Sequence, residues 1–153
     1  MLGAVPKRDV PNTPKDSKMP VVVFVHGGPE SQSRPNFNPV VQYLVHRGYG
    51  VLVPNVRGST GYGNAYEHLD DVEKRMDAVK DLKYAQQWLV KSGYSRPKRI
   101  AVMGGSYGGF MTAWAVTQTQ RFKAAMAALT THAPDQNRMF RITRLRTAPC
   151  RLK

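Results

Sequence analysis

Short runs of apolar residues alternate along the chain with stretches in which apolar positions recur at helical spacing. Four runs predict strands, over residues 21–25, 49–54, 99–103 and 122–129. The first run reads VVVFV, and it ends at a glycine-rich stretch that no regular element tolerates. A short, β-branched and continuously apolar run of this kind is typical of a strand that is buried on both faces of a parallel sheet.

Three stretches between these runs predict helices. Apolar positions recur at helical spacing over residues 39–47, and Gly48 ends that helix as a C-cap. A second apolar stripe covers residues 72–90. Asp70, followed three residues later by a glutamate, has the capping-box pattern that begins such a helix. A third helix is expected over residues 110–119, directly before the last strand.

The alternation of strands and helices predicts an α/β fold with a mostly parallel sheet of about four strands, flanked by helices and joined by right-handed crossovers. We expect three parts. Residues 1–19 form an irregular N-terminal arm, and residues 20–131 form the folded domain. Residues 132–153 form a basic, irregular C-terminal tail, in which neither hydrophobic period continues and the composition turns abruptly to arginine.

Charge and composition narrow the classes of protein that remain. The formal net charge is +13, but six basic residues and no acidic one fall within residues 138–153, so nearly half of the excess lies in one short tail. No strip of aromatic and basic residues, as in RNA-binding sheets, accompanies this charge, so no specific nucleic-acid binding is expected. No apolar run approaches the length of a membrane span, which is about 18 residues or more, so no membrane association is expected.

The N-terminal composition, the cysteine content and the absence of metal-binding motifs exclude further classes of protein. The first twenty residues are polar and lack the apolar stretch of a signal peptide, so a cytoplasmic location is expected. Cys150 is the only cysteine, which leaves no internal disulfide and no cysteine cluster. No HExxH motif, Cys/His cluster or calcium loop is present, so neither a metal nor a cofactor is implied.

The strongest local motif is GGSYGG over residues 104–109, between a predicted buried strand and a predicted helix. It matches G-x-S-x-G, the nucleophile elbow. A serine on such a tight turn adopts a strained backbone, so Gly104 and Gly108, on either side of Ser106, must lack side chains for the turn to close. Ser106 Oγ would then stand clear at the carboxyl edge of the sheet, where the helix N-terminus favours negative charge. The alternative is a plain glycine turn.

A second motif, HGGP over residues 26–29, also ends a predicted strand. Such a loop can aim a backbone N–H at an oxyanion, and the expected donors are the N–H groups of Gly28 and of Tyr107, the residue after the nucleophile. His26 and Gly27 support the motif. A structural role is expected for His26, because it lies on the wrong loop to be the catalytic base.

A third motif, NVRGSTGYG over residues 55–63, follows the second predicted strand. By itself it is a connecting loop whose glycines supply special turn angles. Arg57 can pair with a carboxylate of the fold or reach a substrate, and the pairing with a carboxylate is favoured.

In series, the motifs HGGP, N-x-RGS-x-GYG and GGSYGGF resemble the catalytic domain of the prolyl oligopeptidase family, in particular its acylaminoacyl-peptidase and dipeptidyl-peptidase branch. The resemblance extends over about residues 20–128. It implies a partial α/β-hydrolase fold and the cleavage of short or acylated peptides, often with esterase activity. It also implies that Ser106 is the nucleophile and that Gly28 and Tyr107 form the oxyanion hole.

Two departures from the family pattern bear on activity. Nothing in the sequence resembles the β-propeller that usually precedes the family's catalytic domain. The family's aspartate and histidine follow the serine at a greater distance than this chain extends, so the chain is expected to be truncated after the nucleophile region. His132 and Asp135 are the only histidine and aspartate after Ser106, and their order is reversed; they remain candidate catalytic residues because geometry defines a triad.

Three functions stay open at this point. The first is a serine hydrolase acting on a small ester or short peptide. The second is an inactive fragment that self-associates through an exposed sheet edge, because an unpaired edge strand invites pairing. The third is a basic binding module that uses the arginine-rich tail.

Overall fold

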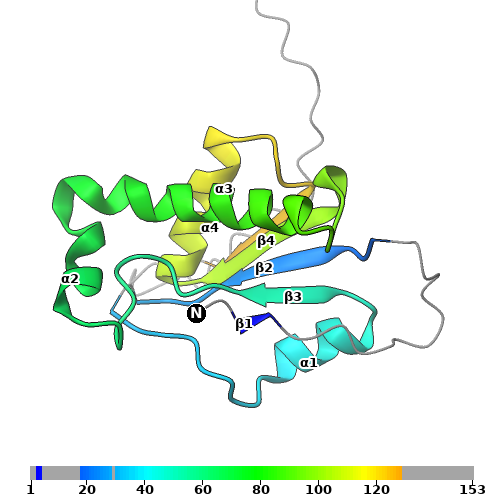
Figure 1. Ribbon diagram of the computed structural model, residues 1–153, viewed down its shortest axis with the longest axis horizontal. Helices are drawn as coiled ribbons and strands as arrows, with labels where there is room; N and C mark the ends of the chain where they lie inside the picture. The colour runs from blue at the N-terminus through cyan, green and yellow to red at the C-terminus, as the bar shows by residue number, and fades with distance from the viewer. Residues whose placement is uncertain (1–2, 5–17, 29, 129–153) are drawn as a thin grey trace, which may run out of the picture.

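A five-stranded sheet forms the centre of the computed structural model, which describes residues 3–4, 18–28 and 30–128 (Figure 1). The strands are β1 (Gly3–Ala4), β2 (Val21–Val25), β3 (Gly50–Val53), β4 (Ile100–Gly105) and β5 (Ala124–Ala128), in the spatial order β1-β3-β2-β4-β5. β2, β3, β4 and β5 run parallel, so the predicted four-stranded parallel sheet is confirmed. β1, which the sequence pattern does not predict, pairs antiparallel with β3.

The helices lie on both faces of this sheet. α1 (Pro39–His46) joins β2 to β3, whereas α3 (Arg75–Lys91) and α4 (Tyr107–Gln118) join β3 to β4 and β4 to β5. In the strand order, the step from β2 to β3 runs in one direction, whereas the steps from β3 to β4 and from β4 to β5 run in the other. Because all three crossovers are right-handed, α1 lies on one face of the sheet and α3 and α4 lie on the opposite face. Figure 1 shows α1 below the strands and α3 above them.

The hydrophobic core lies between the sheet and the pair α3 and α4. Alternate β2 residues point into it, because successive side chains of a strand face opposite sides. The largest fully buried apolar side chains of this layer are those of Val23, Val25, Leu52, Leu82, Ile100, Val102 and Met111. Burying each of them stabilises the fold by about 1.5–3 kcal/mol. This layer fixes the positions of β4 and α4, between which Ser106 lies.

The opposite face of the sheet is less well covered. None of the residues of α1 is buried. The register places Phe24, Met103 and Met126 in one row across β2, β4 and β5, on the face away from the core. Coverage falls along this row: Phe24 and Met103 are half-buried, and Met126 on the outermost strand is 47% exposed.

The start of the long helix differs from the sequence prediction. α3 begins at Arg75, and three short helices precede it: α2 (Asn64–Glu67), η1 (His68–Asp70) and η2 (Val72–Lys74). The predicted N-cap at Asp70 is therefore wrong. Asp71 is extended and interrupts the helix, and Val72 is 86% exposed with a positive φ, so the apolar stripe does not begin there. Asp70 is buried instead and binds the side chain of Tyr107.

The elbow is tighter than the sequence pattern suggested. β4 continues to Gly105 and α4 begins at Tyr107, so Ser106 alone connects them. The predicted helix began at residue 110, because a run of glycines reads as a loop when taken alone. A further short helix, η3 (Pro97–Arg99), leads into β4.

Candidate active site

Ser106 occupies a strained turn at the carboxyl edge of the sheet. Its backbone angles are φ 53° and ψ −123°, in a region that non-glycine residues rarely adopt and that costs about 1–3 kcal/mol. Its side chain is exposed, and although Ser106 is the N-cap residue of α4, its Oγ makes no capping hydrogen bond. The hydroxyl is therefore presented to solvent rather than used by the helix.

The glycines around Ser106 are required by direct backbone contact. A Cβ added at Gly104 would lie 2.5 Å from the carbonyl carbon and oxygen of Gly108. One added at Gly108 would overlap the carbonyl oxygen of Val25 and lie 2.6 Å from that of His26. The elbow can therefore close only where these two positions carry no side chain, as the sequence pattern indicated.

β5 supports the elbow from its other side. The N–H of Ser106 donates to the carbonyl oxygen of Ala128 at 2.8 Å. A Cβ at Gly109 would lie 2.5 Å from that same oxygen, so α4 packs directly on the end of β5. The strained serine is held between the ends of β2 and β5.

The amino end of α4 points toward this turn. The first hydrogen bond of the helix runs from the N–H of Phe110 to the carbonyl oxygen of Ser106 at 3.0 Å. The N–H groups of the first turn and the helix dipole therefore favour negative charge beside Ser106.

The HGG loop lies against the serine side chain. A Cβ added at Gly27 would lie 3.4 Å from Ser106 Cβ and 3.9 Å from Ser106 Oγ. Gly28 follows with φ 121°, which side chains rarely allow. The two backbone segments named by the sequence, residues 26–28 and 106–107, are thus neighbours in space.

Both ring nitrogens of His26 are engaged within this loop region. Nδ1 donates to the carbonyl oxygen of Gly27 at 2.7 Å, because a carbonyl can only accept, and Nε2 lies 3.0 Å from Ser59 Oγ. A general base needs a free nitrogen within hydrogen-bond reach of the serine hydroxyl. His26 offers none to Ser106, in keeping with a structural role.

The side chain of Tyr107 is anchored on the segment that leads into α3. Its hydroxyl donates to Asp70 Oδ2 at 3.0 Å. Burial, and then the hydrogen bond and negative charge of Asp70, raise the pKa of Tyr107 to about 12, with Arg75 opposing the rise. The ring stacks on Phe110, and the Arg75 guanidinium lies 5.9 Å from the ring centroid.

Arg57 pairs with carboxylates on α3. Its Nε and Nη2 donate to Asp81 at distances down to 2.6 Å, and its backbone N–H donates to Asp81 Oδ2 at 3.0 Å. Asp77 lies 3.8 Å from Nη1. The hydrogen bond to Asp81 is the main cause of a raised pKa for Arg57; burial opposes the rise, and the nearby negative charges add to it. The carboxylate pairing favoured by the sequence is found, and it fixes the third motif, over residues 55–63, on α3.

The structure adds residues that the motif analysis did not single out as functional. Asn55 bridges two loops: its Oδ1 accepts from the N–H of Ser33 at 2.7 Å, and its Nδ2 donates to the carbonyl oxygen of Ser33 at 3.1 Å. Ser59 and Asp70 are fully or almost fully buried and contact the HGG loop and Tyr107. Asn55 and Ser59 lie inside the third motif, where they could have been noticed. Asp70 gave no such signal, because its pattern indicated a helix cap.

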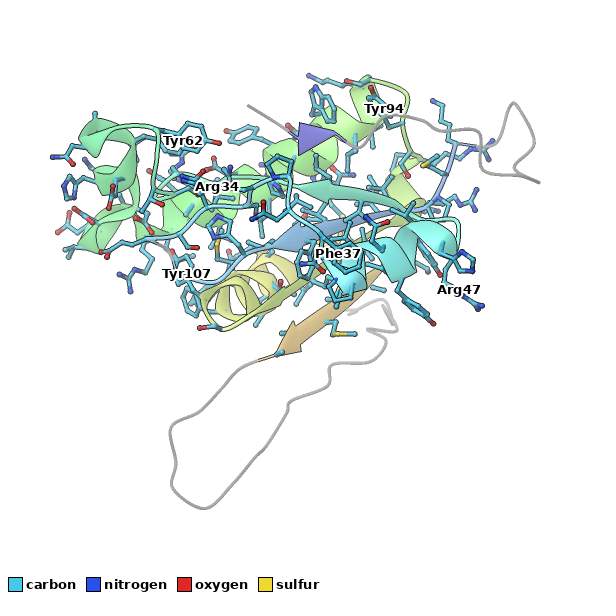
Figure 2. All side chains as sticks on the ribbon, turned by 90° about the horizontal axis from the view of Figure 1, so that it is seen from below. Arg34, Phe37, Arg47, Tyr62, Tyr94 and Tyr107 are labelled. Atoms are coloured by element: carbon cyan, nitrogen blue, oxygen red, sulfur yellow. The ribbon has the colours of Figure 1, made fainter. Side chains whose placement is uncertain are left out.

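Figure 2 shows that the labelled side chains of Arg34, Tyr62 and Tyr107 lie at the same end of the sheet. A hollow of about 480 Å³ also occurs in the molecule, beside the Arg57–Asp81 pair, and residues such as Tyr84 and Trp88 line it. None of the lining residues belongs to the elbow or the HGG loop, so the chemistry-bearing residues rather than this hollow mark the site.

Some predicted groups lie outside the described residues. The candidate catalytic residues His132 and Asp135 are among them, so the structure does not bear on their roles. Within the described residues, no group of three or more His, Cys, Asp or Glu side chains is placed to hold a metal ion. Among the described helices, none is long and apolar enough to cross a membrane.

Parallel strands, flanking helices and a strained serine between strand and helix define the α/β-hydrolase class. A family model described as "Prolyl oligopeptidase family" matches residues 35–136. The chain belongs to the prolyl oligopeptidase family.

Individual relatives agree with this assignment. The chain is 40% identical over 104 residues to dipeptidyl aminopeptidase BIII of Pseudoxanthomonas mexicana, covering 68% of this chain and 15% of that protein. It is 40% identical over 110 residues to an acylamino-acid-releasing enzyme of Arabidopsis thaliana, covering 71% of this chain and 14% of the relative. The crystal structure of a puromycin hydrolase superposes with a TM-score of 0.71 at 34% identity, over 74% of this chain and 17% of that one. The chain thus spans about a sixth of these relatives.

Proposed function

We propose that this chain carries the nucleophile and oxyanion hole of a serine hydrolase that acts on the carbonyl group of an ester or short peptide. The observation that carries the proposal is the state of Ser106: strained, exposed, free of a capping bond and located at the amino end of α4. A strained backbone at an exposed nucleophilic side chain is an arrangement that functional sites maintain against its cost in stability.

The reaction would begin with attack of Ser106 Oγ on the carbonyl carbon. The new C–O bond moves the carbonyl electrons onto oxygen, and the N–H groups of Gly28 and Tyr107 would bind that oxyanion. Its collapse expels the alcohol or amine and leaves an acyl group on Ser106, which water then hydrolyses. The serine proton must pass to a base, a role for which His132, with Asp135 to orient it, is the candidate of this chain.

Esters with a good leaving group suit this site better than amides. An oxyanion hole together with substrate binding retains part of the rate enhancement of serine hydrolases when triad residues are removed. p-Nitrophenolate leaves without needing a proton from an acid, whereas a peptide amine requires one. We therefore expect activated esters to be hydrolysed faster than peptides.

The test is hydrolysis of p-nitrophenyl acetate by the purified chain, compared with Ser106→Ala and His132→Ala. We expect activity in the wild type, its loss in Ser106→Ala, and a smaller decrease in His132→Ala if that residue is the base. Equal rates in the wild type and Ser106→Ala would contradict the proposal, because they would place the activity outside the elbow.

A second candidate function, self-association of the chain without catalysis, is favoured by the outer side of β5. β5 ends the strand order, and the described residues provide no partner for its free edge. Met126 is 47% exposed on that strand. An exposed apolar edge strand is a template for pairing with another chain. We expect concentration-dependent dimers by sedimentation that Met126→Lys weakens and Thr117→Lys, on the exposed part of α4, does not. A monomer at all concentrations would exclude this candidate.

A further inference from the structure

The loop that follows β2 is bonded to the segment over residues 55–70, which lies between β3 and α3. The N–H of Thr60 donates to the carbonyl oxygen of Ser31 at 3.0 Å, and Gln32 Nε2 donates to the carbonyl oxygen of Thr60 at 3.0 Å. Together with the two bonds between Asn55 and Ser33, these contacts join the loop that follows β2 to the loop that follows β3. The segment over residues 55–70 therefore sets where the HGG loop lies.

Ser59 contacts the HGG loop itself, through His26. It has no exposed surface, and both its N–H and its Oγ bond the carbonyl oxygen of Val56, at 3.1 and 2.5 Å. His26 Nε2 lies 3.0 Å from the same Oγ, and the other ring nitrogen of His26 lies 2.7 Å from the carbonyl oxygen of Gly27. A series of close polar contacts thus leads from Val56 through Ser59 and His26 to Gly27, the residue that lies against Ser106.

Asp70, at the other end of the segment, holds the residue after the nucleophile. Asp70 is 3% exposed, and its carboxylate accepts a hydrogen bond from the hydroxyl of Tyr107. Gly58 packs so closely on this carboxylate that a Cβ there would overlap Asp70 Oδ1, and its N–H is bonded to the carbonyl oxygen of Tyr66 at 3.1 Å. Asp70 is therefore fixed by the fold, and through its hydroxyl partner it restrains Tyr107.

We propose that Ser59 and Asp70 are the two positioning residues of the oxyanion hole: Ser59 sets Gly28 through His26 and Gly27, and Asp70 sets Tyr107. This inference rests on the proposed function. Its physical basis is that hydrogen-bond donors stabilise a developing oxyanion only when they are fixed beforehand. A displacement of about 1 Å in such a group lowers rates by on the order of a hundredfold. The two donors come from separate parts of the chain, the HGG loop and the first residue of α4, and one segment restrains both.

The experiment compares the wild type with Ser59→Ala, Asp70→Ala and Asp70→Asn on two substrates, p-nitrophenyl benzoate and p-nitrophenyl thionobenzoate. They share a leaving group, but the developing charge falls on oxygen in one and on sulfur in the other, and sulfur accepts hydrogen bonds more weakly. We expect kcat/KM for the oxygen ester to fall roughly 10- to 100-fold in both alanine variants. The thionoester should lose much less, so the oxygen-to-sulfur rate ratio falls. Asp70→Asn keeps an acceptor and should recover most of the ratio.

A parallel measurement does not depend on catalysis. Backbone ¹⁵N order parameters report fast local motion and are about 0.85 for rigid amides. We expect Ser59→Ala to lower the value at Gly28 and Asp70→Ala to lower it at Tyr107, with the amides of α3 unchanged in both variants. Lys80→Ala, an exposed change on α3, serves as the matched control and should alter neither amide.

The outcomes separate the two proposals. Equal losses on both esters, with the rate ratio unchanged, would show that Ser59 and Asp70 support the fold only, and would overturn the inference while leaving the proposed function standing. If the wild type hydrolyses neither ester, the proposed function fails. The order parameters then decide: local loosening of Gly28 and Tyr107 would support the positioning role, and unchanged values would overturn it.

Discussion

The elbow over residues 104–109 and the segment over residues 55–70 lie at the same edge of the sheet but are held by different kinds of contact. In the elbow, backbone packs on backbone, and the carbonyl groups of Val25 and Ala128 occupy the space where side chains would otherwise project. In the segment, side chains bond across loops, as Ser59 and Asp70 do. The elbow should therefore reject atoms added at Gly104, Gly108 or Gly109, whereas the segment should respond in proportion to the hydrogen bond that is removed.

The largest effect on stability is expected from Gly108→Ala. The added methyl would overlap the carbonyl oxygen of Val25 and crowd that of His26, and neither backbone can move without displacing β2. We expect the free energy of unfolding to fall by about 3 kcal/mol or more, because overpacking against backbone cannot be relieved by a rotamer change. Urea unfolding followed by circular dichroism measures this loss.

Gly105→Ala is the matched control within the same motif. Nothing lies within 4 Å of a Cβ at this position, and its φ is not in the left-handed region. We expect a change of at most about 0.5 kcal/mol. If Gly105→Ala were as damaging as Gly108→Ala, the contacts described here would not be what the motif requires.

The same contrast explains what the sequence could predict. The four parallel strands and the serine turn follow from local patterns. Continuous β-branched runs are typical of strands buried in a parallel sheet, and the glycine spacing reflects the backbone contacts that close an elbow turn. The role of Asp70 could not be read in this way. Its neighbours fit a capping box, and only the approach of Tyr107, distant in sequence, gives the carboxylate its partner. β1 was likewise hidden, since two residues carry no period.

Arg57→Met removes charge from the segment while keeping an unbranched side chain. Arg57 and Asp81 are 29% and 22% exposed and share several hydrogen bonds, so their pairing is screened less than a surface ion pair. We expect the free energy of unfolding to fall by about 1–2 kcal/mol. Arg57→Lys should recover only part of it, because an ammonium cannot make the bidentate contact.

Lys80→Ala tests whether any ion pair on α3 would do the same. Lys80 Nζ lies 2.6 Å from Asp77 Oδ1, a distance equal to that of the shortest contact between Arg57 and Asp81, but the Lys80 side chain is 62% exposed. We expect no measurable change in the urea midpoint. A loss equal to that of Arg57→Met would mean that charge alone, rather than the loop contact, sets the stability of this region.

The last test concerns the link between the two regions, the hydroxyl of Tyr107. Its pKa is raised from 10.0 to about 12, so the folded chain keeps this proton after the unfolded chain has released it. Stability from this group is complete below pH 10 and is lost as the pH rises toward 12. Phenolate absorbance of the folded protein should show a phase near pH 12 that Tyr107→Phe removes. In Asp70→Asn that phase should move down yet stay above 10, because burial is the larger cause of the shift and remains in that variant. A Tyr107 phase at the ordinary value in the wild type would contradict the anchoring of this side chain, and with it the bond that ties the elbow to the segment over residues 55–70.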